Sequence, residues 1–272
     1  MAQSEQGYAI LRFIKKHLPS IRNSDASYVD ECDPALKDLE IEIEPLCFDD
    51  DDNSRDDGEV SSEPLTFSRM SDLLKEKEPW ATPNEIMDMP SLRDVRSGNC
   101  WAARFLGMML LDYLELNRDD DVPGILQDLG KDSFNFPHRY VARFERRYPC
   151  WRVDTWIDSP KSPEPHLSCF VSEESDLKEQ QLSMSVLQIC LAFTHYRLRQ
   201  EKFKECQSAP IITIISASGL RVRIHRASFK LLEGRKGRVS VKKSPIIDLT
   251  DVEGPLSDDI VHILRWMLGS AT

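Results

Sequence analysis

The stretch APIITIISASGLRVRIHRASFKLLEGRKGRVSVKK, residues 209–243, decides the fold. It opens with an apolar run over residues 210–215, which is typical of a buried strand. After a Ser-Gly turn, apolar and basic side chains alternate over residues 220–225. Because successive side chains of a strand point to opposite faces, this alternation predicts a second strand with one buried face and one cationic face. The stretch therefore predicts a β-hairpin, followed by a further strand over residues 238–243.

Helix and strand patterns around the hairpin predict an α+β domain. Residues 100–116 are apolar nearly all round, and apolar residues recur at three- and four-residue spacing over residues 176–199, so both segments are predicted to be long buried helices. Ser257, followed by two aspartates, begins a predicted C-terminal helix. Three more strands are predicted over residues 139–148, 150–157 and 167–171. The fold class is α+β, a mixed sheet flanked by two long buried helices and a C-terminal helix, with a disordered acidic N-terminal tail.

The N-terminal quarter differs from the rest of the chain in charge. Residues 30–63 hold fifteen acidic and two basic residues, a local net charge of −13 that exceeds the −11 of the whole 272-residue chain. So few apolar residues cannot offset the entropy lost on ordering, and we expect disorder there, with a transient strand or short partner-binding motif around Ile41 and Ile43 as the exception. The predicted organisation is a short amphipathic helix over residues 1–18 docked on the domain, a disordered acidic linker over residues 19–66, and a single α+β domain over residues 67–272.

Cysteine usage and hydropathy bear on the compartment. The seven cysteines are an odd number, and no two lie within four residues of each other, so neither a CxxC metal site nor a compact disulfide framework is predicted. This usage fits a reducing compartment. No stretch reaches the roughly 18 uncharged apolar residues that a membrane helix needs, and the N-terminus lacks a secretory signal pattern. We expect a protein of the cytoplasm or nucleus that binds no membrane.

The second arm of the hairpin carries the main candidate binding surface. Residues 221–243 hold nine Lys or Arg residues and a single acid, a local net charge of +8. A cationic stripe along a strand binds phosphates by charge without reading bases, and such binding weakens with salt. The alternative is a solvated sheet face, or a stripe neutralised by the chain's own acidic tail. The nine residues are Arg221, Arg223, Arg226, Lys230, Arg235, Lys236, Arg238, Lys242 and Lys243.

The order of elements over residues 100–216, a helix, three strands, a helix and a strand, resembles the core of the PD-(D/E)XK nuclease-like superfamily. In that family, acids on two neighbouring strands and a lysine two residues after the second acid bind Mg²⁺ and orient the attacking water. No lysine stands at that spacing here. The resemblance implies a metal-dependent nuclease with Mg²⁺ as its cofactor; otherwise these carboxylates are solvated turn residues and no cofactor is expected. The candidate residues are Asp154 or Asp158, Glu173 or Glu174, and Lys178.

The segment over residues 245–259 resembles a SUMO-interacting motif, in which an apolar core followed by acids adds a strand to the edge of SUMO's sheet. The resemblance implies that the apolar side chains fill a groove and that the acids face lysines of a SUMO-like partner. Alternatively, residues 246–249 are an edge strand of the domain itself, packed under the C-terminal helix. The residues of the motif are Ile246, Ile247, Asp248, Leu249, Asp251 and Glu253.

No catalytic motif accompanies these surfaces. The six histidines are scattered, and no Gly-rich phosphate loop is present. The sequence favours a non-catalytic interaction protein that binds an acidic partner, either protein or nucleic acid, through the basic arm. The metal-dependent nuclease and a SUMO-binding adaptor are the alternatives. In the favoured hypothesis the acidic tail competes for the basic arm, so deleting residues 30–63 is expected to strengthen polyanion binding at low salt.

Overall fold

The computed structural model describes residues 4–23, 28–46, 98–116, 151–157, 166–206, 209–232, 236–250 and 257–268. Its elements are α1 (Glu5–Asn23), β1 (Tyr28–Asp30), α2 (Pro34–Asp38), β2 (Ile41–Pro45), α6 (Asn99–Leu116), β3 (Trp151–Ile157), β4 (Leu167–Glu173), β5 (Gln181–Ser183), α8 (Met184–Arg199), η2 (Glu201–Phe203), β6 (Ile212–Ser218), β7 (Arg221–Leu232), β8 (Lys236–Lys243), β9 (Ile247–Asp248) and α9 (Asp258–Leu268).

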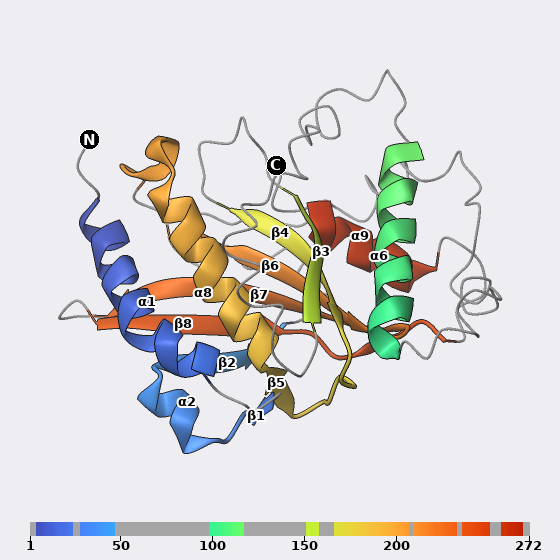
Figure 1. Cartoon of the computed structure of the whole chain (residues 1–272), viewed down its shortest axis with the longest axis horizontal. Helices are drawn as coiled ribbons and strands as arrows, with labels where there is room; N and C mark the ends of the chain where they lie inside the picture. Colours follow the sequence, from blue (N-terminus) through green and yellow to red (C-terminus); the bar gives the residue numbers. More distant parts are fainter. Residues whose placement is uncertain are drawn as a thin grey trace.

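A mixed sheet lies between two layers of helices (Figure 1). Its strands follow the order β2-β8-β7-β6-β4-β3, and β9 pairs with β7 beside this path. The pairs β4–β6 and β2–β8 are parallel, whereas the other pairs of this sheet are antiparallel. A separate two-stranded sheet joins β1 to β5. The predicted α+β fold with a mixed sheet is confirmed.

The predicted hairpin forms the centre of the sheet. β6 and β7 pair antiparallel from Ile212 opposite Ala227 to Ser218 opposite Arg221. Gly219 in the turn has a φ of 61°, a conformation that glycine adopts without the steric cost other residues meet. Since β6 also pairs with β4, it is flanked by strands on both sides and buried along its whole length, as the apolar run predicted.

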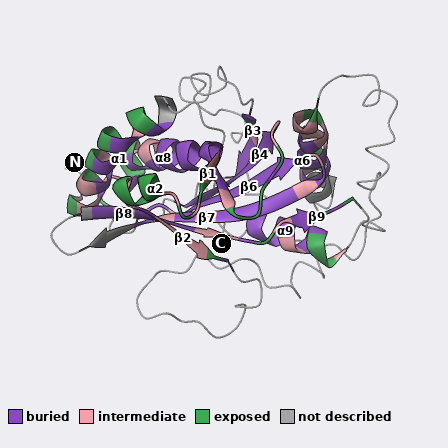
Figure 2. Cartoon of the chain, turned by 90° about the horizontal axis from the view of Figure 1, so that it is seen from below, coloured by how far each residue is buried: buried purple, intermediate pink, exposed green. Residues whose placement is uncertain are grey.

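Apolar side chains on the two sides of the sheet form two cores. The central strands of the sheet are mostly buried (Figure 2). One core lies between the sheet and helices α1 and α8, and includes Ile214 and Phe193. The other lies between the sheet and helices α6 and α9, and includes Ile224 and Ile263. We call these two sides of the sheet the α8 side and the α6 side.

The N-terminal helix docks on the domain, as expected, and continues beyond residue 18. Phe13 meets Phe229 of β7 edge-on, with ring centroids 5.4 Å apart. A Cβ on Gly237 would lie only 3.3 Å from the Phe13 ring, so glycine permits the close approach of α1 to β8. The helix runs through Pro19, and Ile21 is buried in its last turn.

The structure corrects the expected extent of the disordered linker. Residues 20–23 belong to α1, and residues 28–46 form β1, α2 and β2. The physical reason is that apolar residues spaced among the acids, such as Leu36, Ile41 and Leu46, are each less than 9% exposed. The acids between them meet basic residues from distant parts of the chain. Residues 47–66 of the expected linker lie outside the described residues, as does the strand expected over residues 139–148.

Helix α8 begins eight residues later than the prediction of residue 176. Residues 181–183 form β5 against β1 instead. Ser183 then caps the helix, because its hydroxyl accepts a hydrogen bond from the amide of Ser185. The acidic N-terminal segment therefore changes the local structure of a segment some 150 residues away.

Helix α6 is buried on one face, which packs on the sheet, whereas its sequence predicted burial on nearly all sides. A Cβ on Gly107 would lie 2.6 Å from the Phe170 ring of β4, so this glycine sets the distance between helix and sheet. On the outer face of the helix, Trp101 is 42% exposed and Met108 is 47% exposed.

Candidate binding surface

The basic residues of the hairpin are divided between the two sides of the sheet. Ala227 and Phe229 of β7 lie in the core of the α8 side, so odd-numbered positions of this strand face α8 and even-numbered positions face the α6 side. Arg223 and His225 therefore point into the domain, and each is 1% exposed. The prediction that they form part of an outward cationic stripe is wrong. Helix α8 covers the side of the sheet that carries Arg223 and His225, so this face of β7 is not open to solvent.

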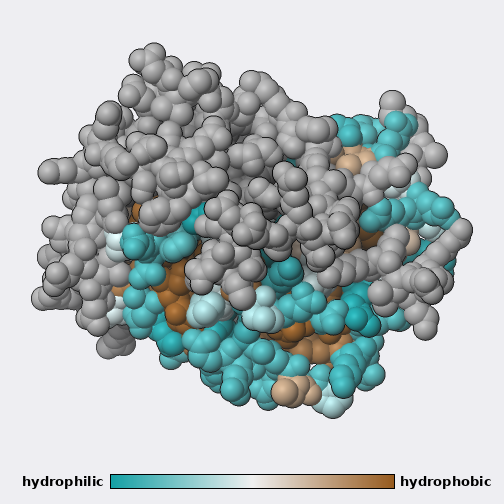
Figure 3. Space-filling view, turned by 180° about the vertical axis from the view of Figure 1, so that it is seen from behind, coloured by the Kyte–Doolittle hydropathy of each residue, from teal (hydrophilic) through white to brown (hydrophobic). Residues whose placement is uncertain are grey.

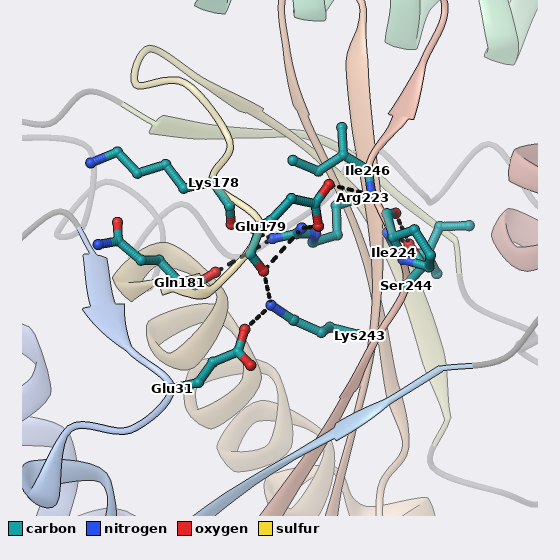
Figure 4. Close-up of polar contacts among 10 residues, drawn as sticks. Glu31, Lys178, Glu179, Gln181, Arg223, Ile224, Lys243, Ser244 and Ile246 are labelled. Carbon is teal, nitrogen blue, oxygen red and sulfur yellow. Dashed lines mark hydrogen bonds and ion pairs between the residues drawn. The ribbon is translucent and has the colours of Figure 1, made fainter.

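Arg223 is a structural cation. Its guanidinium donates to the backbone carbonyls of Lys178 at 2.7 Å and Gln181 at 3.4 Å, and to the carboxylate of Glu179 at 2.6 Å (Figure 4). Burial lowers the pKa of Arg223, and the Glu179 carboxylate beside it opposes that effect. The side chain of Glu179 is 61% exposed, so a surface carboxylate reaches inward to a buried guanidinium.

Two more cations of the α8 side are paired within the chain. Lys243 forms an ion pair with Glu31, which follows β1, and donates to the backbone carbonyl of Glu179. Arg221 lies 3.9 Å from the carboxylate of Asp248. The amide of Ile246 also donates to Glu179, at 3.3 Å. The contacts of Arg223, Lys243 and Glu179 join the residues after β1, the loop before β5, and strands β7 and β8 in one polar cluster.

The strand register assigns further basic positions of β7 and β8 to the α6 side. The β7–β8 register places Arg226 opposite Lys242 and Lys230 opposite Arg238, with a pair of serines between them. The two cationic pairs are four residues apart along the strands, or about 13 Å. Lys236 has the same parity as Arg238 in β8. We call Arg226, Lys230, Arg238 and Lys242 the cationic face.

Acidic residues of β2 border the cationic face. Glu42 pairs with Arg238 at 3.0 Å, and the two side chains stay 42% and 40% exposed. The register places Glu44 opposite Lys242. The chain's acidic segment thus neutralises part of the cationic face, as one of the alternatives from the sequence held. Seen from behind Figure 1, the described surface is mainly hydrophilic, with apolar areas between (Figure 3). Arg235 lies outside the described residues.

The carboxylates of the nuclease interpretation lie on opposite sides of the sheet. Glu173 is buried on the α8 side, where the hydroxyls of Ser183 and Ser185 each donate to it at 2.7 Å. Burial raises the pKa of Glu173, although these hydroxyl donors lower it. By contrast, Glu174 lies on the α6 side, where it accepts a hydrogen bond from the amide of Cys100 at 3.4 Å. Of these two alternatives for the second acid, only Glu174 therefore lies on the same side of the sheet as Asp154.

Of the other nuclease candidates, the structure describes Asp154 and Lys178. Asp154 lies on the α6 side, 3.7 Å from Arg104 of α6. Lys178 lies over the ring of Tyr28, 5.4 Å from its centroid. Asp158 lies outside the described residues. Among the residues that the structure describes, no three His, Cys, Asp or Glu side chains come together as a metal site.

The SUMO-like segment is built into the sheet. Asp248 pairs with Arg221 and Ile247 with Val222 as β9 meets β7. Ile247 is 7% exposed and Leu249 is fully buried in the core of the α6 side. The segment is therefore an edge strand of the domain, as the alternative held, and its apolar side chains are already packed. Ile246 is half-buried, and Asp251 and Glu253 lie outside the described residues.

Sequence reasoning missed the acids that meet the cations: Glu31, Glu42 and Glu179. Their only signal was the opposite charge of two distant segments, which indicates attraction but not which pairs form. No disulfide joins the five cysteines of the described ranges to one another.

Comparisons of this chain with protein-family models, with curated proteins and with solved structures found no match. None of the described helices is long and apolar enough to span a membrane.

Proposed function

We propose that this chain is a non-catalytic interaction protein of the cytoplasm or nucleus that binds an acidic partner through the cationic face. The β7–β8 register carries the proposal, because it sets Arg226 beside Lys242 and Lys230 beside Arg238. A face with four basic positions close together is complementary in charge to a partner with several negative charges.

An acidic protein is favoured over a nucleic acid. The cationic face already accepts a carboxylate, since Glu42 pairs with Arg238 at 3.0 Å. Phe229 is the only Phe, Tyr or Trp in β7 and β8, and it is buried on the α8 side. These two strands therefore place no such ring on the cationic face on which a base could stack.

The proposal is tested with fluorescently labelled poly-L-glutamate and the full chain at low salt. The double variant Lys230→Glu/Lys242→Glu replaces two attractions by two repulsions, and an ion pair at a protein surface contributes about 0.2–1 kcal/mol. We expect at least a fivefold loss of affinity, since 1.4 kcal/mol is tenfold. The control Arg12→Glu/Lys15→Glu makes the same charge change on exposed positions of α1 and should lose much less.

Equal losses in the two variants would show that only net charge matters, and no loss in either would remove the cationic face from the interaction. A DNA duplex serves as the second probe. If it binds more tightly than polyglutamate and responds to the same variant, the partner is a nucleic acid and the choice of an acidic protein is wrong.

A further inference from the structure

Strand β2 is an edge strand supplied by the acidic part of the chain. It pairs parallel with β8 over five residues, from Ile41 opposite Val239 to Pro45 opposite Lys243. Main-chain hydrogen bonds continue beyond both ends, because the amide of Val239 donates to Glu40 at 3.0 Å and the amide of Leu46 donates to Lys243 at 2.7 Å. β2 therefore covers the edge that β8 would otherwise present.

The side chains of β2 match the two sides of β8. Ile41 is buried in the core of the α8 side, and Ile43 packs against that core. Glu42 and Glu44 alternate with them and border the cationic face, where Glu42 pairs with Arg238 at 3.0 Å. β2 thus has the pattern of a ligand for this edge: apolar residues on one face, acids on the other.

We infer that the edge of β8 is a docking site for an extended acidic strand of a partner protein, and that β2 is its intramolecular occupant. The inference rests on the proposed function, because Arg238 and Lys242 belong to the cationic face. The partner segment alternates Ile or Val with Glu or Asp. It pairs with β8 through main-chain hydrogen bonds, and its apolar and acidic side chains supply the specificity. β2 must leave for the partner strand to bind, so the chain's own strand regulates access.

Ile41 and Ile43 attach β2 to the core of the α8 side, and Leu46 after it is buried on the α6 side. The entropy regained when these residues leave β8 offsets part of the free energy of their burial. The turn before β2 is strained. Glu40 has a φ of 56°, in the left-handed region that costs a residue with a Cβ free energy. Side chains of α1 meet this turn. The imidazole of His17 lies 3.5 Å from the Glu40 carboxylate, and the ammonium group of Lys16 lies 4.0 Å from it.

The sheet order also permits the exchange. Strands β6 and β7 do not contact β2 in the sheet order, and the centre of the sheet keeps its partners when β2 leaves. An opening of this kind is a local event and needs no global unfolding.

The test uses the labelled peptide LEIEIEPL, the sequence of residues 39–46, added to the full chain. Wild type is compared with Ile41→Ala/Ile43→Ala, which weakens the resident strand and leaves β8 intact. We expect the peptide to bind the variant at least tenfold more tightly than wild type, and the lysine peptide LKIKIKPL to bind neither. Equal binding of both peptides, or no gain in the variant, would overturn the inference.

A second measurement does not depend on the variant. In the unmodified chain, the hydrogen exchange of the β2 amides should be at least 100-fold faster than that of the β6 amides. If β2 exchanges as slowly as β6, the strand does not open locally and the inference is wrong. Polyglutamate titrations run in parallel separate the two proposals. Binding of polyglutamate without peptide exchange defeats only the inference, and peptide exchange without polyglutamate binding defeats only the proposed function.

Discussion

Replacing Glu179 with alanine removes the carboxylate partner of a buried guanidinium. The lost hydrogen bond to Arg223 is 2.6 Å long, and a hydrogen bond to a charged group contributes about 1.5–3 kcal/mol. Removing one partner of a fully buried ion pair costs about 3–5 kcal/mol. Here the cost is lower, because Glu179 is 61% exposed and the carbonyls of Lys178 and Gln181 still accept from Arg223. We expect a loss of about 1.5–3 kcal/mol in the free energy of unfolding.

The assay is urea unfolding at pH 7, followed by tryptophan fluorescence, with an unchanged m-value as the sign that only stability has changed. Gln180→Ala is the matched control, since residue 180 is exposed and adjacent, and it should fall within about 0.5 kcal/mol of wild type. The double variant Glu179→Ala/Arg223→Met should lose less than the sum of the two single losses, because the two side chains interact directly. If Glu179→Ala costs no more than Gln180→Ala, Arg223 is not stabilised by this carboxylate and its structural role must be given up.

Three further predictions concern packing and pH. Gly107→Ala should lower the free energy of unfolding by about 1–3 kcal/mol, because its Cβ would lie 2.6 Å from the ring of Phe170, and Phe170→Leu should recover part of the loss. Burial lowers the pKa of His225 to about 3. In the unfolded chain the His pKa is about 6.5, so the unfolded state binds a proton at pH values where the folded state does not. The free energy of unfolding therefore falls as the pH drops from about 6.5 toward 3. In urea unfolding at pH 7 and pH 5, the free energy of unfolding of His225→Phe should rise relative to that of wild type at the lower pH. The same difference between the two proteins at both pH values would contradict this. Burial raises the pKa of Glu173, so its effect has the opposite sign: stability present below the unfolded pKa is lost as the pH rises through the folded pKa. The melting temperature of Glu173→Gln should therefore rise relative to that of wild type as the pH increases from 4 to 8. A constant difference between the two melting temperatures would show that the carboxyl of Glu173 does not titrate in this range.

Periodicity predicted the elements that are held by regular burial. The pattern of residues 209–243 predicted the central hairpin, and the spacing of apolar residues predicted helices α6, α8 and α9, although α8 begins eight residues later than predicted. These elements could be predicted because regular burial along a helix or strand requires a regular spacing of apolar residues in its own sequence.

The docking of the acidic segment could not be predicted from local composition. Residues 28–46 have too few apolar side chains to fold alone, but they add to a sheet that already exists. The contact between Glu42 and Arg238 joins residues 196 apart in sequence, and it is formed only when β2 reaches β8. A net charge counted over one segment does not include such partners.

The sequence predicted which basic residues belong to the hairpin, but it did not predict which of their side chains face solvent. Alternation along β7 correctly put Arg223 and Val222 on opposite faces, and the error was to assign the face of Arg223 to solvent. Whether a sheet face is covered depends on where helices cross it, and α8 crosses the face that carries Arg223 and Lys243.

The most direct test of the cationic face is an NMR titration of the ¹⁵N-labelled full chain with poly-L-glutamate. The account predicts that the largest chemical-shift changes occur at the amides of Arg226, Lys230, Arg238 and Lys242 and decrease with added salt. Changes confined to the exposed cations of α1, or an absence of change at β7 and β8 when polyglutamate is bound, would contradict it.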